Sequence, residues 1–327
     1  PGASLNDAFG HGAFRIKDRQ NNIDVVYGYG EYDFGAPNFY LKFAQGKLNY
    51  LLSKTDFNRF YNIYSYFDRS IYEQVLNLTT EEKQKLFDYL IFNYKPENRG
   101  YLYEFFFDNC ATKIKDVTNA TLNNTIIFKK PADFKDASFR TLIHNKLNKN
   151  SWGSFGIDLA LGSVIDRQAT TEDHMFLPEN IYKFFEVASK GPNGEALVKQ
   201  NHVLYAKKNK WKSCSFVTSP LCILGILGLL ILFITYKDYN SHKQSKWLDL
   251  TLFSITGCIG ILILLLWFAT DHKGTHQNYN LLWAFALNVL CIPQLLKNKV
   301  SLWFIKYIKL LIILLCLRVL HWIIGVQ

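Results

Sequence analysis

The chain has 327 residues, of which 49% are hydrophobic and 20% are charged, and its formal net charge is +10. Residues 1–215 carry a net charge of +4 and residues 216–327 a net charge of +6, although the second part is shorter and far more apolar. Basic residues that flank apolar segments usually meet anionic lipid, so the charge argues against a nucleic-acid partner and favours an integral membrane protein.

Residues 1–212 are predicted to form one α+β domain. Gly12–Asp18 and Ile23–Tyr29 alternate apolar and polar residues on either side of the polar segment Arg19–Asn22, which predicts a β-hairpin. The hydrophobic periodicity and the capping residues predict the elements that follow, namely helices at Lys54–Tyr72, Thr79–Asn93, Cys110–Val117, Phe139–Leu147 and Ile181–Ala188, and a strand at Leu197–Tyr205.

Residues 213–327 are predicted to form a transmembrane domain of four helices. A helix needs about 20 apolar residues to cross a bilayer. Four stretches are long and apolar enough to be considered: Phe216–Tyr236, Leu248–Ala269, Leu281–Leu296 and Leu302–Val326. The third is short and contains Pro293 near its end.

Lysines in the connectors predict the orientation of these helices. Lys237–Trp247 contains three lysines, and four more lie between residues 297 and 309, whereas Thr270–Asn280 contains only Lys273. Because short lysine-rich loops stay in the cytoplasm, we expect an inner-membrane protein with the large domain, Thr270–Asn280 and the C-terminus outside, the domain being periplasmic. The lysines among residues 207–212 argue for the opposite orientation but are outnumbered.

Cys110 is the strongest candidate for a catalytic nucleophile. Asp108 or Asn109 is a good N-cap, so Cys110 should lie in the first turn of a helix, where the helix dipole favours a thiolate. The N–H groups at this helix start, around Asn109 and Ala111, can also stabilise an oxyanion. The alternative interpretation is a buried structural cysteine, since the domain offers no disulfide framework.

His11 is the candidate general base. It stands between Gly10 and Gly12 at the start of the first predicted strand, and flanking glycines leave the ring open to substrate. Across the hairpin, His11 should face the segment that contains Glu31 and Asp33. Asp33 is the predicted orienting carboxylate and Glu31 the alternative, although either can be a solvated loop residue.

A strand-borne histidine followed by a helix-N-terminal cysteine resembles the permuted papain-like arrangement of the lecithin–retinol acyltransferase group. Longer segments resemble the Lnb family of bacterial lipoprotein N-acyltransferases over nearly the whole chain. They include PGASLNDAFGHGAFRIKD (1–18), VYGYGEYDFGAPNFYLKFAQGKLNY (26–50), EQVLNLT (73–79), NCATKIKDV (109–117), WGSFGIDLALGSVIDRQAT (152–170), FLPENIY (176–182) and WFATDHKGTHQNYNLLW (267–283).

The resemblance implies a cysteine-dependent acyltransferase with no cofactor and no metal. It would move an acyl chain from a membrane phospholipid donor to the N-terminal amine of a diacylglyceryl lipoprotein acceptor, with Cys110 as nucleophile and His11 as base. The chain departs from the family pattern at four positions. Gly12 stands where the family often has a serine, and Ala111 where it usually has a serine or threonine. Lys113 and Lys115 stand where it usually has arginines.

Four polar residues of the membrane domain are predicted to bind substrate. Asp271, His272 and His276 lie on the outer connector, where Asp271 would hold the incoming ammonium and His272 the donor phosphate. Arg318 lies in the outer half of the last span, where an ionisable group is costly unless it is functional or reaches the interface. A hydrated turn is the alternative for the connector, and snorkelling to the interface is the alternative for Arg318.

Two other functions fit the same residues. The first is a membrane-anchored thiol peptidase or amidase of the cell wall, which would form a peptide adduct on Cys110. The second is a non-enzymatic membrane sensor, in which Cys110 would be unreactive at neutral pH.

Overall fold

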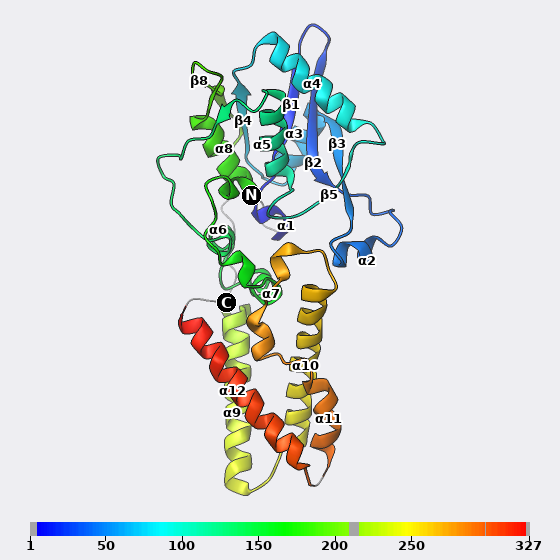
Figure 1. Ribbon diagram of the computed structural model, residues 1–327, viewed down its shortest axis with the longest axis vertical. Helices are drawn as coiled ribbons and strands as arrows, with labels where there is room; N and C mark the ends of the chain where they lie inside the picture. Colours follow the sequence, from blue (N-terminus) through cyan, green and yellow to red (C-terminus); the bar gives the residue numbers. More distant parts are fainter. Residues whose placement is uncertain (1–4, 209–215, 298, 325–327) are drawn as a thin grey trace. The chain divides into compact units, whose positions relative to one another are not determined.

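The computed structural model describes residues 5–208, 216–297 and 299–324, and the chain divides into two compact units (Figure 1). Residues 1–146 and 168–212 form the first, here called the α/β unit, and residues 147–167 and 213–327 form the second, the helical unit. The predicted domain boundary between residues 212 and 213 lies outside the described residues.

An antiparallel sheet of four strands organises the α/β unit. Its order is β1-β2-β3-β5, with β1 (Ala13–Asp18), β2 (Ile23–Glu31), β3 (Asn49–Asp56) and β5 (Gly100–Leu102). The predicted hairpin is confirmed: Ala13 pairs with Gly28 and Asp18 with Ile23. The Asp18 carboxylate accepts hydrogen bonds from the backbone of Gln20 and Asn21, which closes the turn.

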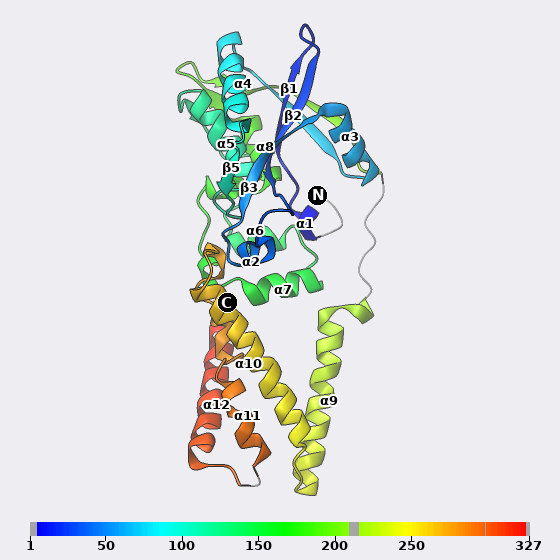
Figure 2. The same ribbon diagram turned by 90° about the vertical axis from the view of Figure 1, so that its right-hand side faces the viewer.

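The remaining strands of this unit form two smaller, separate sheets, and its helices surround the strands, as Figures 1 and 2 show. The strands are β4 (Ile71–Leu76), which pairs with β9 (Val198–Tyr205), and the short β6 (Ile126–Ile127), β7 (Ser189–Lys190) and β8 (Glu195–Ala196). The helices are α1 (Leu5–Ala8), α2 (Phe39–Ala44), α3 (Phe57–Tyr66), α4 (Thr80–Tyr94), α5 (Cys110–Thr121), α6 (Phe139–His144), the 3-10 turn η2 (Asp173–Phe176) and α8 (Pro178–Val187).

Helix α5 lies in the middle of the hydrophobic core, where it packs on β1, β2, α4, α8 and η2. Its Ala111 is fully buried, as are Leu52 of β3, Leu90 of α4 and Met175 of η2. Burial of this apolar surface stabilises the unit and holds the start of α5 against the sheet.

The structure confirms most predicted elements of this unit with small shifts, but the predicted helix Lys54–Tyr72 is wrong at both ends. Strand β3 continues to Asp56, whose carboxylate then caps α3 by accepting from the backbone of Asn58 and Arg59. The helix ends before Asp68, which has a positive φ of 51°, and β4 begins at Ile71. The segment predicted as one helix is therefore the end of β3, then α3, then the start of β4, and the cap at Asp56 sets the first of these boundaries.

The helical unit contains five helices among its described residues: α7 (Trp152–Ala160), α9 (Pro220–Ser241), α10 (Lys246–Phe268), α11 (Asn288–Leu296) and α12 (Leu302–Ile323). Short 3-10 turns lie between them, at η1 (Ser163–Ile165), η3 (Phe216–Thr218), η4 (Lys273–Thr275) and η5 (Tyr279–Leu282). In the described part of the chain, α9 and α10 are long and apolar enough to cross a membrane.

The predicted third span, Leu281–Leu296, is not one helix. Turn η5 ends at Leu282, and α11 begins only at Asn288. Nine helical residues are about 14 Å long, well short of the roughly 30 Å hydrocarbon core. The predicted fourth span corresponds to α12, which has 22 residues but carries Lys306, Lys309 and Arg318. The count of four transmembrane helices is therefore not confirmed.

Helices α10 and α11 pack closely because α10 has glycines on the shared face. A Cβ atom on Gly257 would lie 2.5 Å from Val289 Cγ2 of α11, and one on Gly260 would clash with the Ala284 carbonyl oxygen in the segment before α11. Polar side chains join this region further, since Asn288 donates to Thr256 Oγ1 at 2.8 Å and Tyr307 donates to Asn288 Oδ1 at 2.5 Å. Small residues and paired polar groups are typical of helix packing in lipid.

Residues 147–167, predicted within the N-terminal domain, group with the helical unit instead. The physical reason is a set of hydrogen bonds to the connector between α10 and α11. The backbone N–H of Gly162 donates to the Gly274 carbonyl at 2.9 Å, and the Asn278 amide donates to Leu159 and Ala160 carbonyls at 2.9 and 3.1 Å. The connector is therefore packed against α7 and η1 rather than fully hydrated.

Candidate functional site

Asn109 fixes the start of α5 and thereby the position of Cys110. Its side-chain oxygen accepts from the backbone N–H groups of Ala111 and Thr112 at 2.8 and 3.0 Å. Its side-chain amide donates to the carbonyls of Phe105 and Phe176, at 2.7 and 2.8 Å. The predicted N-cap is thus confirmed as Asn109, and every polar atom of its side chain is engaged.

The backbone N–H of Asn109, predicted as an oxyanion donor, is engaged as well. It donates to Thr112 Oγ1 at 2.8 Å, which completes a capping box at the start of the helix. Asn109 is therefore better placed to order the helix start than to bind a substrate oxygen. The backbone N–H of Ala111 donates to Asn109 Oδ1 and also faces the Cys110 sulfur.

Cys110 and His11 form a hydrogen-bonded pair. Burial of Cys110, which is 8% exposed, opposes its ionisation, but the charge and hydrogen bond of His11 and the N–H groups of Gly12 and Ala111 outweigh it and lower the pKa of the thiol. For His11, desolvation opposes protonation, but the Cys110 thiolate and the Glu31 carboxylate outweigh it and raise the pKa of the imidazole. The pair therefore favours the thiolate–imidazolium form.

Gly28 and Gly30 of β2 lack side chains next to His11 and Cys110. A Cβ atom on Gly28 would lie 3.2 Å from His11 Nε2, and one on Gly30 would lie 3.8 Å from Cys110 Cβ. Gly30 has a φ of +99°, a conformation that glycine adopts without strain, and the β2–β3 register shifts between Tyr29 and Glu31. Both glycine positions therefore face the reactive pair.

The structure favours Glu31 over Asp33 as the carboxylate that acts on His11. The Glu31 charge contributes to the raised pKa of His11. Asp33 lies on the exposed turn after β2, where its side chain accepts from the Gly35 backbone N–H at 2.8 Å. Asp33 thus has a local structural partner, and its orienting role stays a prediction.

Three tyrosines surround Cys110 and were not predicted as site residues. Burial raises the pKa of Tyr64 to about 12, and it also raises the pKa of Tyr101 and Tyr103; the Cys110 charge acts on all three. Tyr101 and Tyr103 are two residues apart in an extended segment and share one face. That period-two spacing just before the Asn-Cys pair is the signal that could have revealed them.

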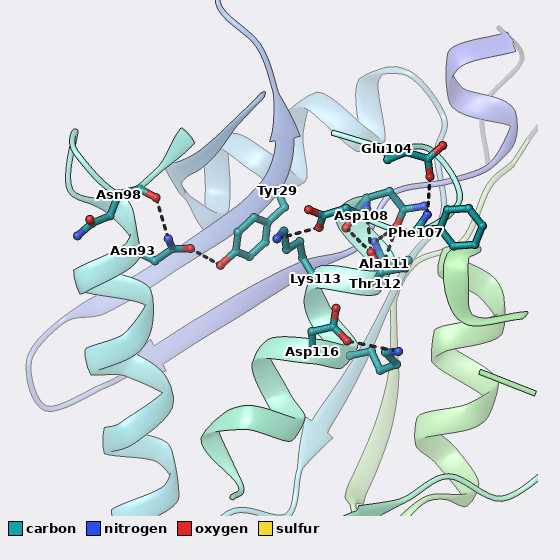
Figure 3. Close-up of polar contacts among 12 residues, drawn as sticks. Tyr29, Asn93, Asn98, Glu104, Phe107, Asp108, Ala111, Thr112, Lys113 and Asp116 are labelled. Atoms are coloured by element: carbon teal, nitrogen blue, oxygen red, sulfur yellow. Dashed lines mark hydrogen bonds and ion pairs between the residues drawn. The ribbon is translucent and has the colours of Figure 1, made fainter. Parts of the chain in front are cut away.

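Lys113 and Lys115, which replace arginines of the family pattern, form ion pairs on α5. Lys113 Nζ lies 2.8 Å from Asp108 Oδ1, as Figure 3 shows, and Lys115 Nζ lies 3.5 Å from Glu172 Oε2. Figure 3 also shows Glu104 accepting from the Phe107 backbone. A pocket of about 420 Å³ lies beside Thr112 and Lys115 and is lined on its other side by residues 170–173.

The four predicted substrate-binding residues of the membrane domain belong to the helical unit, and Cys110 and His11 belong to the α/β unit. Asp271 is exposed, and His272 and His276 are half-buried at the ends of η4. Arg318 donates to Asn280 Oδ1 at 3.3 Å. Within the described ranges, no group of three His, Cys, Asp or Glu side chains could hold a metal ion.

Two family models match the chain. Residues 1–143 match the Lnb N-terminal periplasmic domain, and residues 212–327 match the Lnb transmembrane domain. No curated protein and no solved structure matches. The two matched ranges correspond to the mixed α/β region that carries Cys110 and His11 and to the region that carries the candidate spans. The chain is thus a membrane protein with a periplasmic-type N-terminal domain, and it belongs to the Lnb family.

Proposed function

We propose that this protein transfers a fatty acyl chain from a membrane phospholipid to the N-terminal amine of a diacylglyceryl-cysteine lipoprotein, through a thioester on Cys110. Membership of the Lnb family implies a role like that of a lipoprotein N-acyltransferase. The observation that carries the specific reaction is the hydrogen-bonded Cys110–His11 pair at the start of α5, with the pKa of the thiol lowered.

The fold around this pair supports a permuted papain-like arrangement. His11 precedes β1 of an antiparallel sheet, and Cys110 opens a helix packed on β1 and β2 of that sheet. Nucleophile and base thus come from two elements that the core holds together, which keeps their geometry fixed during two successive reactions.

In the first half-reaction, the Cys110 sulfur attacks the carbonyl carbon of a phospholipid ester. The C–S bond forms, the carbonyl π electrons move to oxygen, and the tetrahedral intermediate then expels the glycerol oxygen. The His11 imidazolium gives its proton to that oxygen, so lysophospholipid leaves and a neutral imidazole remains. His11 is an exposed residue, which supports access of the leaving group to this proton.

In the second half-reaction, the lipoprotein amine attacks the thioester carbonyl. His11, now neutral, accepts a proton from the amine as the C–N bond forms, and the C–S bond breaks to return the thiolate. The raised pKa of His11 suits it to hold that proton beside the thiolate.

We further propose that the protein is a multi-pass inner-membrane protein and that its helical unit helps to bind the lipid substrates. Confinement in the membrane plane raises the effective concentration of donor and acceptor. In this proposal Asp271 binds the incoming ammonium, which gives one proton to water before its amine attacks, while His272, His276 and Arg318 contact donor phosphate. Asp271 is exposed at the turn after α10, so it can meet headgroups at a membrane surface, and Arg318 donates to the buried Asn280.

The test is mass spectrometry of lipoprotein N-termini after incubation of the full-length protein in phospholipid nanodiscs. Wild type should give N-acylated lipoprotein and a lipid-derived thioester on Cys110, and Cys110→Ala should give neither. Retention of N-acylation within about tenfold by Cys110→Ala would contradict the covalent route, because loss of a nucleophile normally costs orders of magnitude. A peptide adduct on Cys110 would favour a cell-wall peptidase, and an unreactive thiol would favour a sensor.

A further inference from the structure

The hydroxyl of Tyr101 is an unusual atom in this site. Among the residues that the structure describes, it is one of the few buried side-chain polar atoms without a hydrogen-bond partner. A buried hydroxyl without a partner costs about 1–3 kcal/mol. Such groups are uncommon in folded proteins, and a catalytic role is one of the explanations for them.

The hydroxyl lies next to the nucleophile. The Cβ position of Gly30 is 3.9 Å from Tyr101 Oη and 3.8 Å from Cys110 Cβ, so both atoms border the same small space. Tyr103 Cε2 closes this space at 3.7 Å from the same point. Because Gly30 has no side chain, β2 adds no atom beyond its backbone at this point between Tyr101 and Cys110.

Three contacts fix the direction of the Tyr101 ring. Tyr101 pairs with Tyr50 across β5 and β3, and its ring meets the edge of Tyr29 with centroids 5.8 Å apart. Lys113 Nζ lies 4.7 Å from the ring centroid, and Asp108 holds that ammonium. A ring held by its strand, an aromatic neighbour and a cation is preorganised, so its hydroxyl need not reorganise during a reaction.

Three backbone N–H groups near Cys110 already have partners. The Asn109 N–H bonds Thr112 Oγ1, and the N–H groups of Gly12 and Ala111 face the Cys110 sulfur. An acyl transfer still needs donors for the oxygen that becomes negative at each tetrahedral intermediate. We propose that Tyr101 Oη donates this hydrogen bond and is a catalytic oxyanion-hole residue, an inference that rests on the acyl-transfer function proposed above.

The same donor serves both half-reactions. When sulfur attacks the ester, the carbonyl π electrons move to oxygen and the Tyr101 O–H donates to it; when the glycerol oxygen leaves with the proton of His11, the C=O bond re-forms. The amine attack repeats the cycle with the thiolate as leaving group. Tyr101 keeps its proton throughout, since burial raises its pKa far above the ordinary value of a tyrosine.

The experiment compares Tyr101→Phe with wild type in full-length protein in phospholipid nanodiscs. Rapid-quench mass spectrometry measures single-turnover thioester formation, iodoacetamide alkylation between pH 5 and 9 measures the pKa of Cys110, and thermal unfolding measures stability. We expect thioester formation to slow about 100-fold. Alkylation should stay within about twofold, and Tm should equal or exceed that of wild type, because the lost hydroxyl had no partner.

Tyr29→Phe is the matched control. Its ring contacts Tyr101, but its hydroxyl donates to Asn93 at 2.5 Å, in the chain of contacts with Asn98 drawn in Figure 3. We expect thioester formation within about threefold of wild type, as for loss of one core hydrogen bond.

Three results would overturn the assignment of Tyr101: wild-type thioester formation by Tyr101→Phe, a shifted alkylation profile, or a lowered Tm that accounts for the lost activity. These outcomes differ from failure of the proposed function. In that case Cys110→Ala would retain N-acylation, whereas an error about Tyr101 alone leaves Cys110→Ala inactive.

Discussion

The Asn109 side-chain amide donates to the Phe176 carbonyl at 2.8 Å, and this contact joins the start of α5 to turn η2 across 67 positions of sequence. The same side chain caps α5 through Ala111 and Thr112. One residue therefore caps the helix that presents Cys110 and also ties that helix to turn η2.

Asn109→Asp separates these two roles. Aspartate keeps the cap, but it cannot donate, so the Phe105 and Phe176 carbonyls lose their partners inside the protein. We expect a loss of about 2–3 kcal/mol in the free energy of unfolding, measured in denaturant. Asn119→Asp, on the same helix, is the control. Equal stability of Asn109→Asp and wild type would show that these two donations contribute nothing.

His11→Ala tests the coupling of the reactive pair. Because the imidazolium lowers the pKa of Cys110, its removal should raise that pKa, so less thiolate exists near pH 7 and alkylation by iodoacetamide slows. The difference should vanish at high pH, where both proteins are fully ionised. His202→Ala, at an exposed position of β9, is the control. Superimposable profiles of wild type and His11→Ala from pH 5 to 9 would mean that the two residues are uncoupled.

Glu31 and Asp33 can be distinguished by neutral isosteres. The Glu31 charge helps raise the pKa of His11, so Glu31→Gln should lower the pH at which His11 loses its proton, measured by NMR of the imidazole. Asp33→Asn should leave that titration unchanged, because its carboxylate bonds the Gly35 backbone. The reverse pattern would restore Asp33 as the orienting residue.

Asp271→Asn tests the proposed role of the outer connector. If Asp271 holds the incoming ammonium, the variant should slow transfer to the lipoprotein severalfold more than it slows thioester formation on Cys110, as for loss of one charged hydrogen bond. Both half-reactions can be followed separately on purified protein. Wild-type rates in both would leave Asp271 without a role, and equal losses in both would point to donor binding or folding.

The orientation of the membrane region can be tested by cysteine labelling. With the native thiols replaced, Gln244→Cys, between α9 and α10, should react with an impermeant maleimide only after the cytoplasmic face is opened. Gln277→Cys, between η4 and η5, should react from outside in intact spheroplasts. Labelling of Gln244→Cys from outside would reverse the topology and remove the periplasmic assignment of the catalytic region.

Local sequence signals predicted the elements that local interactions build. The hairpin followed from alternation and a polar turn, and the start of α5 followed from the capping preference of Asn109. The third predicted span is not one helix, because residues 283–287 interrupt it between Asn280 and Asn288, which make part-buried tertiary hydrogen bonds to Asp158 and Thr256. Apolar composition alone does not reveal such contacts.

In the candidate site, too, residues with local sequence signals were predictable and residues placed by tertiary contacts were not. His11 and Cys110 were found because each stands in a recognisable local setting. The choice between Glu31 and Asp33 could not be made from the sequence, because the β2–β3 register shifts between Tyr29 and Glu31 and alternation alone does not predict such a shift. Tyr101 comes from a strand that pairs with β3 from the far side of the sheet, so its approach to Cys110 depends on tertiary structure.

Gly28 and Gly30 of β2 also determine how the gene tolerates missense mutations. Every missense mutation of a glycine codon adds a side chain. Any such substitution at position 28 or 30 therefore changes the space beside His11 and Cys110. At Gly28 the new Cβ lies 3.2 Å from the His11 ring, and at Gly30 the positive φ adds backbone strain. In a mutational screen for loss of activity, these two codons should therefore yield inactivating alleles about as often as the codons of the reactive pair.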